Sequence, residues 1–138
     1  MAKNKIKLDK LRVMIVDDQA DMRGMIRHML AELGINQVFE AVDGKQAMAF
    51  MDDALDMIDL VICDWNMPAM SGVEVLRQLR SVDMDMPFLM VTGRNDMNSV
   101  SEAKASGVTG YISKPFSLDQ MENKIRIIME RIGHRLSA

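Results

Sequence analysis

Hydrophobic and polar positions alternate along the chain in a way that predicts a parallel α/β sheet. Short apolar runs are separated by longer amphipathic stretches, which is the pattern of successive β-α-β units. The runs predict five strands: Arg12–Val16, Gln37–Ala41, Leu60–Cys63, Phe88–Val91 and Thr109–Ser113. The third run is apolar at every position, as expected of a strand that is covered on both faces.

The amphipathic stretches predict five helices, and several of them have recognisable ends. Asp43 is a good N-cap for the second helix, and Ser71 and Ser117 open capping patterns for the third and fifth helices. Gly34 is expected to stop the first helix. The inward positions of that first helix are expected to be Met22, Met25, Ile26, Met29, Leu30 and Leu33.

The fourth helix differs from the others in composition. It is expected at about Asn98–Ser106 and carries few large apolar side chains, chiefly Val100. Because an element with little buried apolar surface opens readily, we expect this helix to be the least firmly packed and the most able to move.

The order of the strands in the sheet follows from connection rules. Right-handed crossovers place helices on both faces only if the strand order reverses once. The order 2-1-3-4-5 does so and puts strands one and three side by side at the reversal, where ligands bind in such sheets. We expect one domain over residues 1–138, with a core of about residues 10–132 and short polar extensions at both ends.

Composition narrows the class of protein without indicating a function. The 138 residues carry a formal net charge of −3, which argues against a nucleic-acid binder that works by neutralising phosphates. The single cysteine, Cys63, excludes an internal disulfide framework, and its neighbours predict a buried thiol. The single tryptophan, Trp65, is expected to be a partly exposed loop residue. No secretory sequence and no membrane-spanning run is visible, so we expect a cytoplasmic protein without membrane insertion.

Polar groups stand at the carboxyl ends of four predicted strands. Asp17 and Asp18 follow the first strand. Asp64 follows the third strand, Thr92 the fourth and Lys114 the fifth. Because these ends share one edge of a parallel sheet, we expect the three carboxylates to converge, with the threonine and the lysine across the same pocket. Each residue alone has an ordinary explanation, such as a turn or a solvated charge, and it is their joint placement that indicates a site.

Three carboxylates within a few ångströms repel one another, so the pocket needs a cation. Mg²⁺ favours one or two carboxylates, waters and a phosphoryl oxygen. Lys114 could hold a second phosphoryl oxygen, and the Thr92 hydroxyl could donate to a third. The pocket would then stabilise the group that passes through phosphoryl transfer, with Asp64 as the nucleophile that becomes an acyl phosphate.

Together these motifs resemble the receiver domain of two-component response regulators, above all the single-domain, CheY-like chemotaxis regulators. The residues that carry the resemblance are Asp17-Asp18, Asp64-Trp65-Asn66-Met67-Pro68, Met70, Gly72, Thr92-Gly93, Tyr111 and Lys114-Pro115-Phe116. The resemblance covers about residues 10–132 and implies the flavodoxin-like form of the doubly wound sheet. The order 2-1-3-4-5 is that of this family, so the topology expected above and the resemblance are not independent.

The resemblance implies a role for each residue of the site. Asp64 would be the phosphoacceptor and, with Asp18, a ligand of Mg²⁺. The backbone carbonyl of Asn66 would be a further ligand, and Asp17 would act through water. Lys114 would contact the phosphoryl group.

The resemblance also implies a switch and a phosphate lifetime. Thr92 would move toward the phosphoryl group and Tyr111 would turn inward behind it, which would bias the fourth helix, the fifth strand and the fifth helix between two arrangements. The Lys114–Pro115 bond is expected to be cis. Asn66 and Arg94 occupy the two positions with which the family tunes the lifetime of the phosphate.

The leading hypothesis is a stand-alone switch and not an enzyme: it accepts phosphate from a histidine kinase, alters its surface and slowly dephosphorylates itself. Two outputs stay open, the flagellar motor switch of chemotaxis and a histidine phosphotransfer protein of a phosphorelay; a phosphatase partner also stays open. The pair Trp65-Asn66 favours chemotaxis, whereas the segment Arg94–Asn98 lacks the lysines of motor-binding relatives. Residues Gly107–Gly110 lack the acidic pair of dimerising receivers, so we expect a monomer.

The alternative from a different class is a Mg²⁺-dependent phosphatase with an aspartyl nucleophile. Haloacid-dehalogenase-like enzymes of this kind need Asp-x-Asp after the first strand, but Gln19 stands at the third position here. A flavodoxin-like electron carrier is disfavoured because no Ser/Thr/Gly-rich phosphate loop follows the first strand.

Overall fold

A computed structural model describes residues 7–93 and 97–132 of the chain. Its five strands form one parallel sheet in the order β2-β1-β3-β4-β5, which confirms the expected topology. The strands are β1 (Arg12–Val16), β2 (Gln37–Ala41), β3 (Leu60–Asp64), β4 (Phe88–Thr92) and β5 (Gly110–Ser113). The helices are α1 (Ala20–Glu32), α2 (Gly44–Ala54), α3 (Gly72–Val82), α4 (Met97–Ala105) and α5 (Leu118–Arg131), with a 3₁₀ turn, η1 (Leu55–Met57), after α2.

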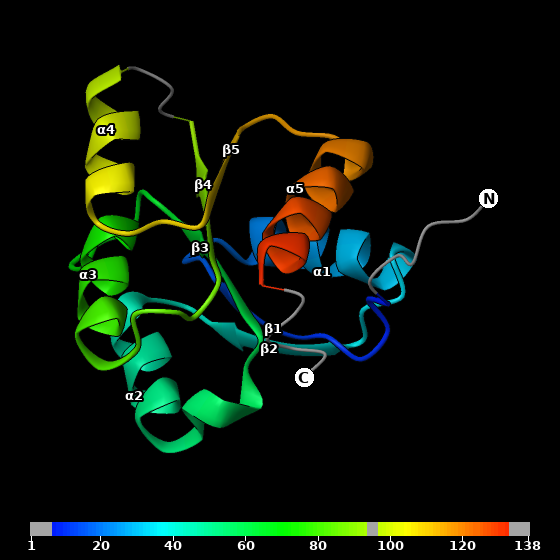
Figure 1. Cartoon of the computed structure of the whole chain (residues 1–138), viewed down its shortest axis with the longest axis horizontal. Coiled ribbons are helices and arrows are strands. Elements are labelled where there is room, and N and C mark those ends of the chain that lie inside the picture. Colours follow the sequence, from blue (N-terminus) through cyan, green and yellow to red (C-terminus); the bar gives the residue numbers. More distant parts are fainter. Residues whose placement is uncertain (1–6, 94–96, 133–138) are drawn as a thin grey trace.

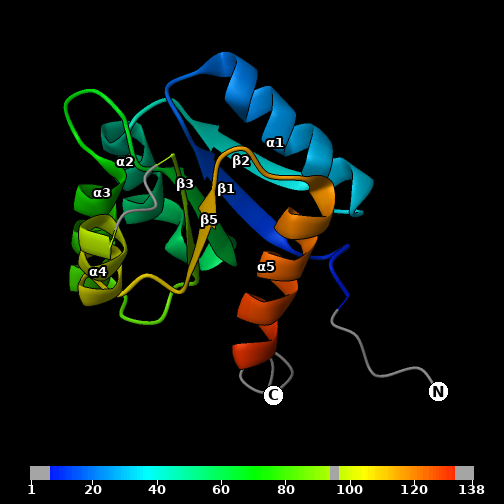
Figure 2. The same ribbon diagram turned by 90° about the horizontal axis from the view of Figure 1, so that it is seen from above.

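Helices cover both faces of the sheet, α1 and α5 on one face and α2, α3 and α4 on the other (Figure 1, Figure 2). The alternation of side chains along each strand divides the core accordingly. Val13 and Ile15 of β1 belong to the cluster with α1 and α5. Met14 and Val16 belong to the cluster with α2, α3 and α4. Both faces of the inner strands are therefore buried, as the apolar composition of the third run predicts.

The predicted helix ends are largely confirmed. The Asp43 side chain accepts from the backbone N–H of Gln46 at the start of α2. Ser71 and Ser117 each form a complete capping box at the start of α3 and α5. Gly34 follows α1 with a φ of 88°, a left-handed conformation that glycine adopts without strain.

Some boundaries and positions differ from the predictions. Asp64 and Thr92 are the last residues of β3 and β4 and not the first of the following loops. Met25, expected inside, is exposed, because Ile26 and Leu30 form the buried line of α1 and Met25 lies at the edge of that face.

Cys63 is fully buried as predicted, and this burial raises the pKa of its thiol well above the ordinary value. Within the described ranges, no helix is long and apolar enough to cross a membrane.

Helix α4 is packed through small side chains. Its buried residues are Ser99 and Ala103, whereas Val100, its chief large apolar residue, is only half-buried. In contrast, α5 buries four large side chains: Met121, Ile125, Ile128 and Met129. The small size of the side chains that α4 buries agrees with the prediction that it is the weakly packed helix.

Hydrogen exchange tests this difference. We expect the amides of α4 to exchange at least about tenfold faster than those of α5, because local opening exposes less apolar surface in α4. Exchange followed by mass spectrometry on the intact chain would measure both helices in one experiment. Equal protection of the two helices would contradict the prediction.

Candidate acidic site at the edge of the sheet

The structure brings three carboxylates together where β1 and β3 end side by side. Val16 of β1 pairs with Cys63 of β3, so the residues that follow are adjacent. One carboxylate oxygen from each of Asp17, Asp18 and Asp64 lies within 4.8 Å of the others. Asp17 and Asp64 are buried, and Asp18 is exposed. The convergence expected from the strand ends is therefore observed.

Backbone hydrogen bonds fix Asp17. Its N–H donates to the Ala41 carbonyl at 3.1 Å, which extends the contact with β2 by one residue. Its Oδ1 accepts from the N–H of Gln19 at 2.8 Å. Its Oδ2 is buried and has no hydrogen-bond partner in the described part of the chain. A buried carboxylate oxygen without a donor is costly, and such an atom beside two further carboxylates fits a site for a hard divalent cation.

Lys114 forms an ion pair with Asp64. The distance from its Nζ to Asp64 Oδ1 is 2.9 Å, and the two side chains are 26% and 6% exposed. The N–H of Lys114 donates to the Thr92 carbonyl at 2.8 Å, which ties the residue to the end of β4. The Lys114–Pro115 bond is cis, as expected. The lysine therefore approaches the three carboxylates from the β5 side of the edge.

The local charges shift the acidity of the buried carboxyls. Burial raises the pKa of Asp64, the bond and charge of Lys114 oppose this effect, and the charge of Asp18 adds to it. Burial also raises the pKa of Asp17. The hydrogen bond from the Gln19 N–H lowers this pKa, and the repulsion of the Asp64 charge raises it further. One lysine thus does not balance three acids, and a bound divalent cation would supply the missing charge.

Thr92 and Tyr111 lie on neighbouring strands near this edge. Thr92 is fully buried and pairs with Ser113 of β5. Tyr111 pairs with Met90, is half-buried, and packs against the cluster of α2, α3 and α4. It also lines a cavity of about 440 Å³ between α4, β5 and α5. Of the two residues predicted to act as a switch, Thr92 thus ends β4 and Tyr111 borders that cavity.

The segment after Asp64 differs from expectation at Trp65. Asn66 is exposed in the loop, but Trp65 is only 5% exposed, so its prediction as a partly exposed residue is wrong. The reason is that Trp65 continues the sheet: its N–H donates to the Val91 carbonyl at 2.9 Å. Its ring then packs in the core with α2 and α3. Arg94, predicted to tune the phosphate lifetime, lies outside the described residues.

Two contacts at the site could not be foreseen. The Arg23 side chain of α1 donates to the Asp17 carbonyl at 2.8 Å and to Glu40 of β2 at 3.0 Å. Gly72, at the start of α3, lies so close to β3 that an added Cβ would be 2.3 Å from the carbonyl oxygen of Asp64. Neither contact follows from sequence spacing, because each joins residues of different elements through a backbone carbonyl.

Comparison with known proteins agrees with this geometry. Residues 13–126 match the response regulator receiver domain, and the chain belongs to this family of two-component proteins. Similar relatives within the family include proteins named as chemotaxis proteins. It is 36% identical over 125 residues to the chemotaxis protein CheY of Pseudomonas aeruginosa, which covers 89% of this chain and 99% of the relative.

Further relatives give the same result. The chemotaxis protein CheY-3 of Vibrio cholerae is 36% identical over 124 residues, which is 88% of this chain and 94% of the relative. A solved structure of the Vibrio cholerae chemotaxis protein CheY4 superposes with a TM-score of 0.79 at 32% identity, and the match covers 86% of this chain and 98% of that chain. The chain is thus a CheY-like receiver.

Proposed function

We propose that the protein is a phosphorylation switch of chemotaxis signalling, which accepts a phosphoryl group on Asp64 from a histidine kinase in a Mg²⁺-dependent reaction. The observation that carries the proposal is the position of the Asp64 carboxylate, 2.9 Å from the Lys114 ammonium and within 4.8 Å of the carboxylates of Asp17 and Asp18. A nucleophile, a cation and a set of metal ligands thus meet at one point.

Each residue of the site would have a separate role in phosphoryl transfer. An Asp64 oxygen attacks the phosphorus, the bond from phosphorus to the histidine nitrogen breaks, and the histidine leaves with the electron pair. Asp18, Asp64 and the Asn66 carbonyl would hold Mg²⁺, with Asp17 acting through water, and the ion would supply positive charge against the phosphoryl oxygens. Lys114 leaves its pairing with the free carboxylate and contacts a phosphoryl oxygen. Water later hydrolyses the acyl phosphate, which resets the switch.

The output surface would be formed by α4, β5 and α5. The cavity of about 440 Å³ on this surface has an apolar wall that includes Val100 and Tyr111. Lys104, Lys124 and Arg131 contribute positive charge to it. Movement of Thr92 and Tyr111 on phosphorylation would change this cavity, and the weakly packed α4 permits such a change.

The downstream partner is proposed from the relatives. They are named as chemotaxis proteins, which favours the flagellar motor switch over a histidine phosphotransfer protein as the target. A phosphatase acting on the acyl phosphate would be a further partner.

A phosphorylation assay tests the proposal. With Mg²⁺ and a small acyl phosphate as donor, the intact protein is expected to gain one phosphoryl group, and excess EDTA is expected to prevent the gain. Borohydride reduction of the acyl phosphate, followed by peptide mapping, should locate the modified residue at Asp64. Incorporation that persists in EDTA, or that maps to another residue, would sink the proposed mechanism.

A further inference from the structure

The loop that carries Asp17 and Asp18 is held to the end of β2 at two points. One is the hydrogen bond from the Asp17 N–H to the Ala41 carbonyl. The other runs through a side chain: Arg23 of α1 donates from its Nη1 to the Asp17 carbonyl at 2.8 Å, and from its Nε to Glu40 Oε1 at 3.0 Å. Both backbone polar groups of Asp17 are therefore anchored to β2, one directly and one through Arg23.

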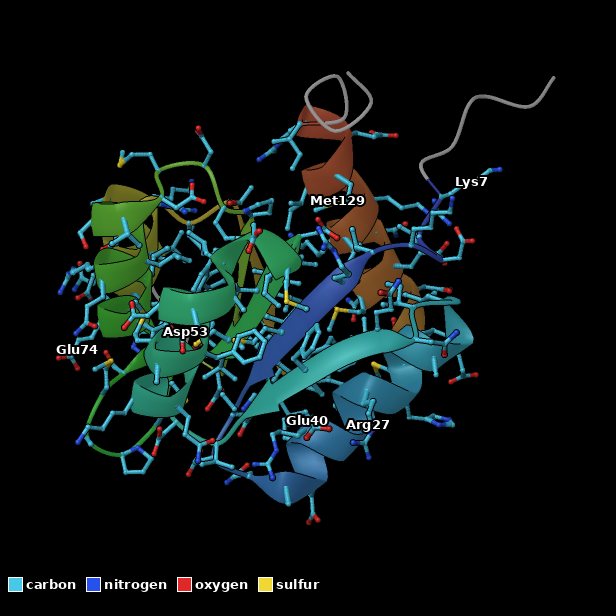
Figure 3. The ribbon with its side chains drawn as sticks, turned by 90° about the horizontal axis from the view of Figure 1, so that it is seen from below. Lys7, Arg27, Glu40, Asp53, Glu74 and Met129 are labelled. Carbon is cyan, nitrogen blue, oxygen red and sulfur yellow. The ribbon has the colours of Figure 1, made fainter. Side chains whose placement is uncertain are left out.

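The Arg23 side chain is shielded, with only 16% of it exposed. Arg27 lies one helical turn further along α1 and donates to the other oxygen of the same Glu40 carboxylate. Figure 3 shows Arg27 and Glu40 facing each other across α1 and β2. Arg27 is 58% exposed, so the two arginines share one acidic partner, but in the described structure the bond to the Asp17 carbonyl comes from Arg23.

We propose that Arg23 is a positioning residue for the metal site, an inference that rests on the proposed function because it concerns the binding of Mg²⁺. The Asp17 carbonyl belongs to the peptide group that joins Asp17 to Asp18. Fixing this peptide group restricts the backbone between the two carboxylates and hence the direction in which each one points. Residues that orient metal ligands typically change metal affinity by about 10–100-fold when they are removed.

The chemistry of the side chain explains why an arginine suits this position. A guanidinium presents several N–H donors in a rigid fork, so it can bind a backbone carbonyl and a carboxylate at the same time in fixed directions. A lysine ammonium sits on a flexible stem and does not reproduce that geometry. Glu40 holds the guanidinium in place, since it accepts from Nε while Nη1 donates to the Asp17 carbonyl.

The test compares Mg²⁺ affinity among matched variants, read from the fluorescence of Trp65 and from calorimetry. Arg23→Ala is expected to weaken Mg²⁺ binding by about tenfold, at the lower end of the range for residues that orient ligands. Arg23→Lys should weaken it to an intermediate degree, and Arg27→Ala should leave it unchanged, although it removes an ion pair from the same glutamate. In EDTA, the amide NMR signals of Asp18 and Gln19 should shift in Arg23→Ala and not in Arg27→Ala.

The outcomes separate the inference from the proposed function. If the wild-type protein binds no Mg²⁺ by either method, the proposed function fails. If the wild-type protein binds Mg²⁺ and both Arg23 variants bind it equally well, the inference fails and the function stands. If Arg23→Ala does not fold, Arg23→Lys decides the matter. A loss of unfolding free energy with unchanged affinity would give Arg23 a purely structural role and overturn the inference.

Discussion

Asp64→Asn is expected to abolish phosphoryl incorporation while leaving the protein folded. The amide has nearly the shape of the carboxylate, so it fits the end of β3, but it is not a nucleophile at this site and cannot form an acyl phosphate. The loss should therefore be complete within the detection limit of intact mass measurement. Asp53→Asn is the matched control, because Asp53 is an exposed carboxylate near the C-terminal end of α2 (Figure 3) and is not one of the three clustered carboxylates. Full phosphorylation of Asp64→Asn would rule out Asp64 as the acceptor.

The same variant has a second, thermodynamic consequence in EDTA. Because burial raises the pKa of Asp64 above its ordinary value of 3.8, the folded state binds the proton more readily than the unfolded state does. The contribution of Asp64 protonation to the free energy of unfolding is fully present below about pH 3.8, and it is lost as the pH rises through the raised pKa of the folded state. Asparagine does not titrate, so Asp64→Asn should gain stability relative to the wild-type protein as the pH increases toward neutrality. Urea titrations at several pH values measure this difference, and a fall in the stability of Asp64→Asn relative to the wild-type protein with rising pH would contradict the prediction.

The sequence predicts this site well where the chemistry depends on strand ends. Asp17, Asp64 and Lys114 directly follow predicted strands, and the topology of a parallel sheet then determines that they meet. The prediction fails where tertiary contacts extend an element. Trp65 is buried because its backbone continues the ladder with β4 beyond Asp64. A run of sequence letters does not show how far pairing continues after the apolar residues end.

Contacts that side chains make with backbone atoms also could not be predicted from the sequence. In the sequence, Arg23 is an ordinary polar residue of an amphipathic helix. Its partner is a backbone carbonyl, a group that every residue has, so no sequence pattern indicates the contact. Glu40 reads as a polar position of an edge strand, yet it holds Arg23 in place. Only the spatial pairing of α1 with the end of β2 shows that these two residues act on the acidic loop.

Gly72→Ala is expected to lower the free energy of unfolding by about 3 kcal/mol, at the upper end of the usual cost of overpacking. An added Cβ would lie 2.3 Å from the Asp64 carbonyl oxygen and 2.9 Å from the Met90 sulfur. The methionine side chain can move aside, but the carbonyl belongs to β3 and is fixed by the sheet. Gly72 does not have a positive φ, so the cost comes from lack of space and not from backbone strain.

Gly24→Ala provides the control for this prediction. Gly24 lies inside α1, and an added Cβ there meets no atom within 4 Å. Alanine at that position should raise the unfolding free energy by up to about 1 kcal/mol, because it favours the helix more than glycine does. Opposite signs for the same chemical change would show that the close approach of α3 to β3 is what costs stability. Because the displaced atom is the carbonyl oxygen of Asp64, the proposed phosphoacceptor, Gly72→Ala should also slow phosphorylation of the protein that remains folded. Unchanged stability and rate in Gly72→Ala would mean that the approach of α3 to Asp64 places no constraint on the site.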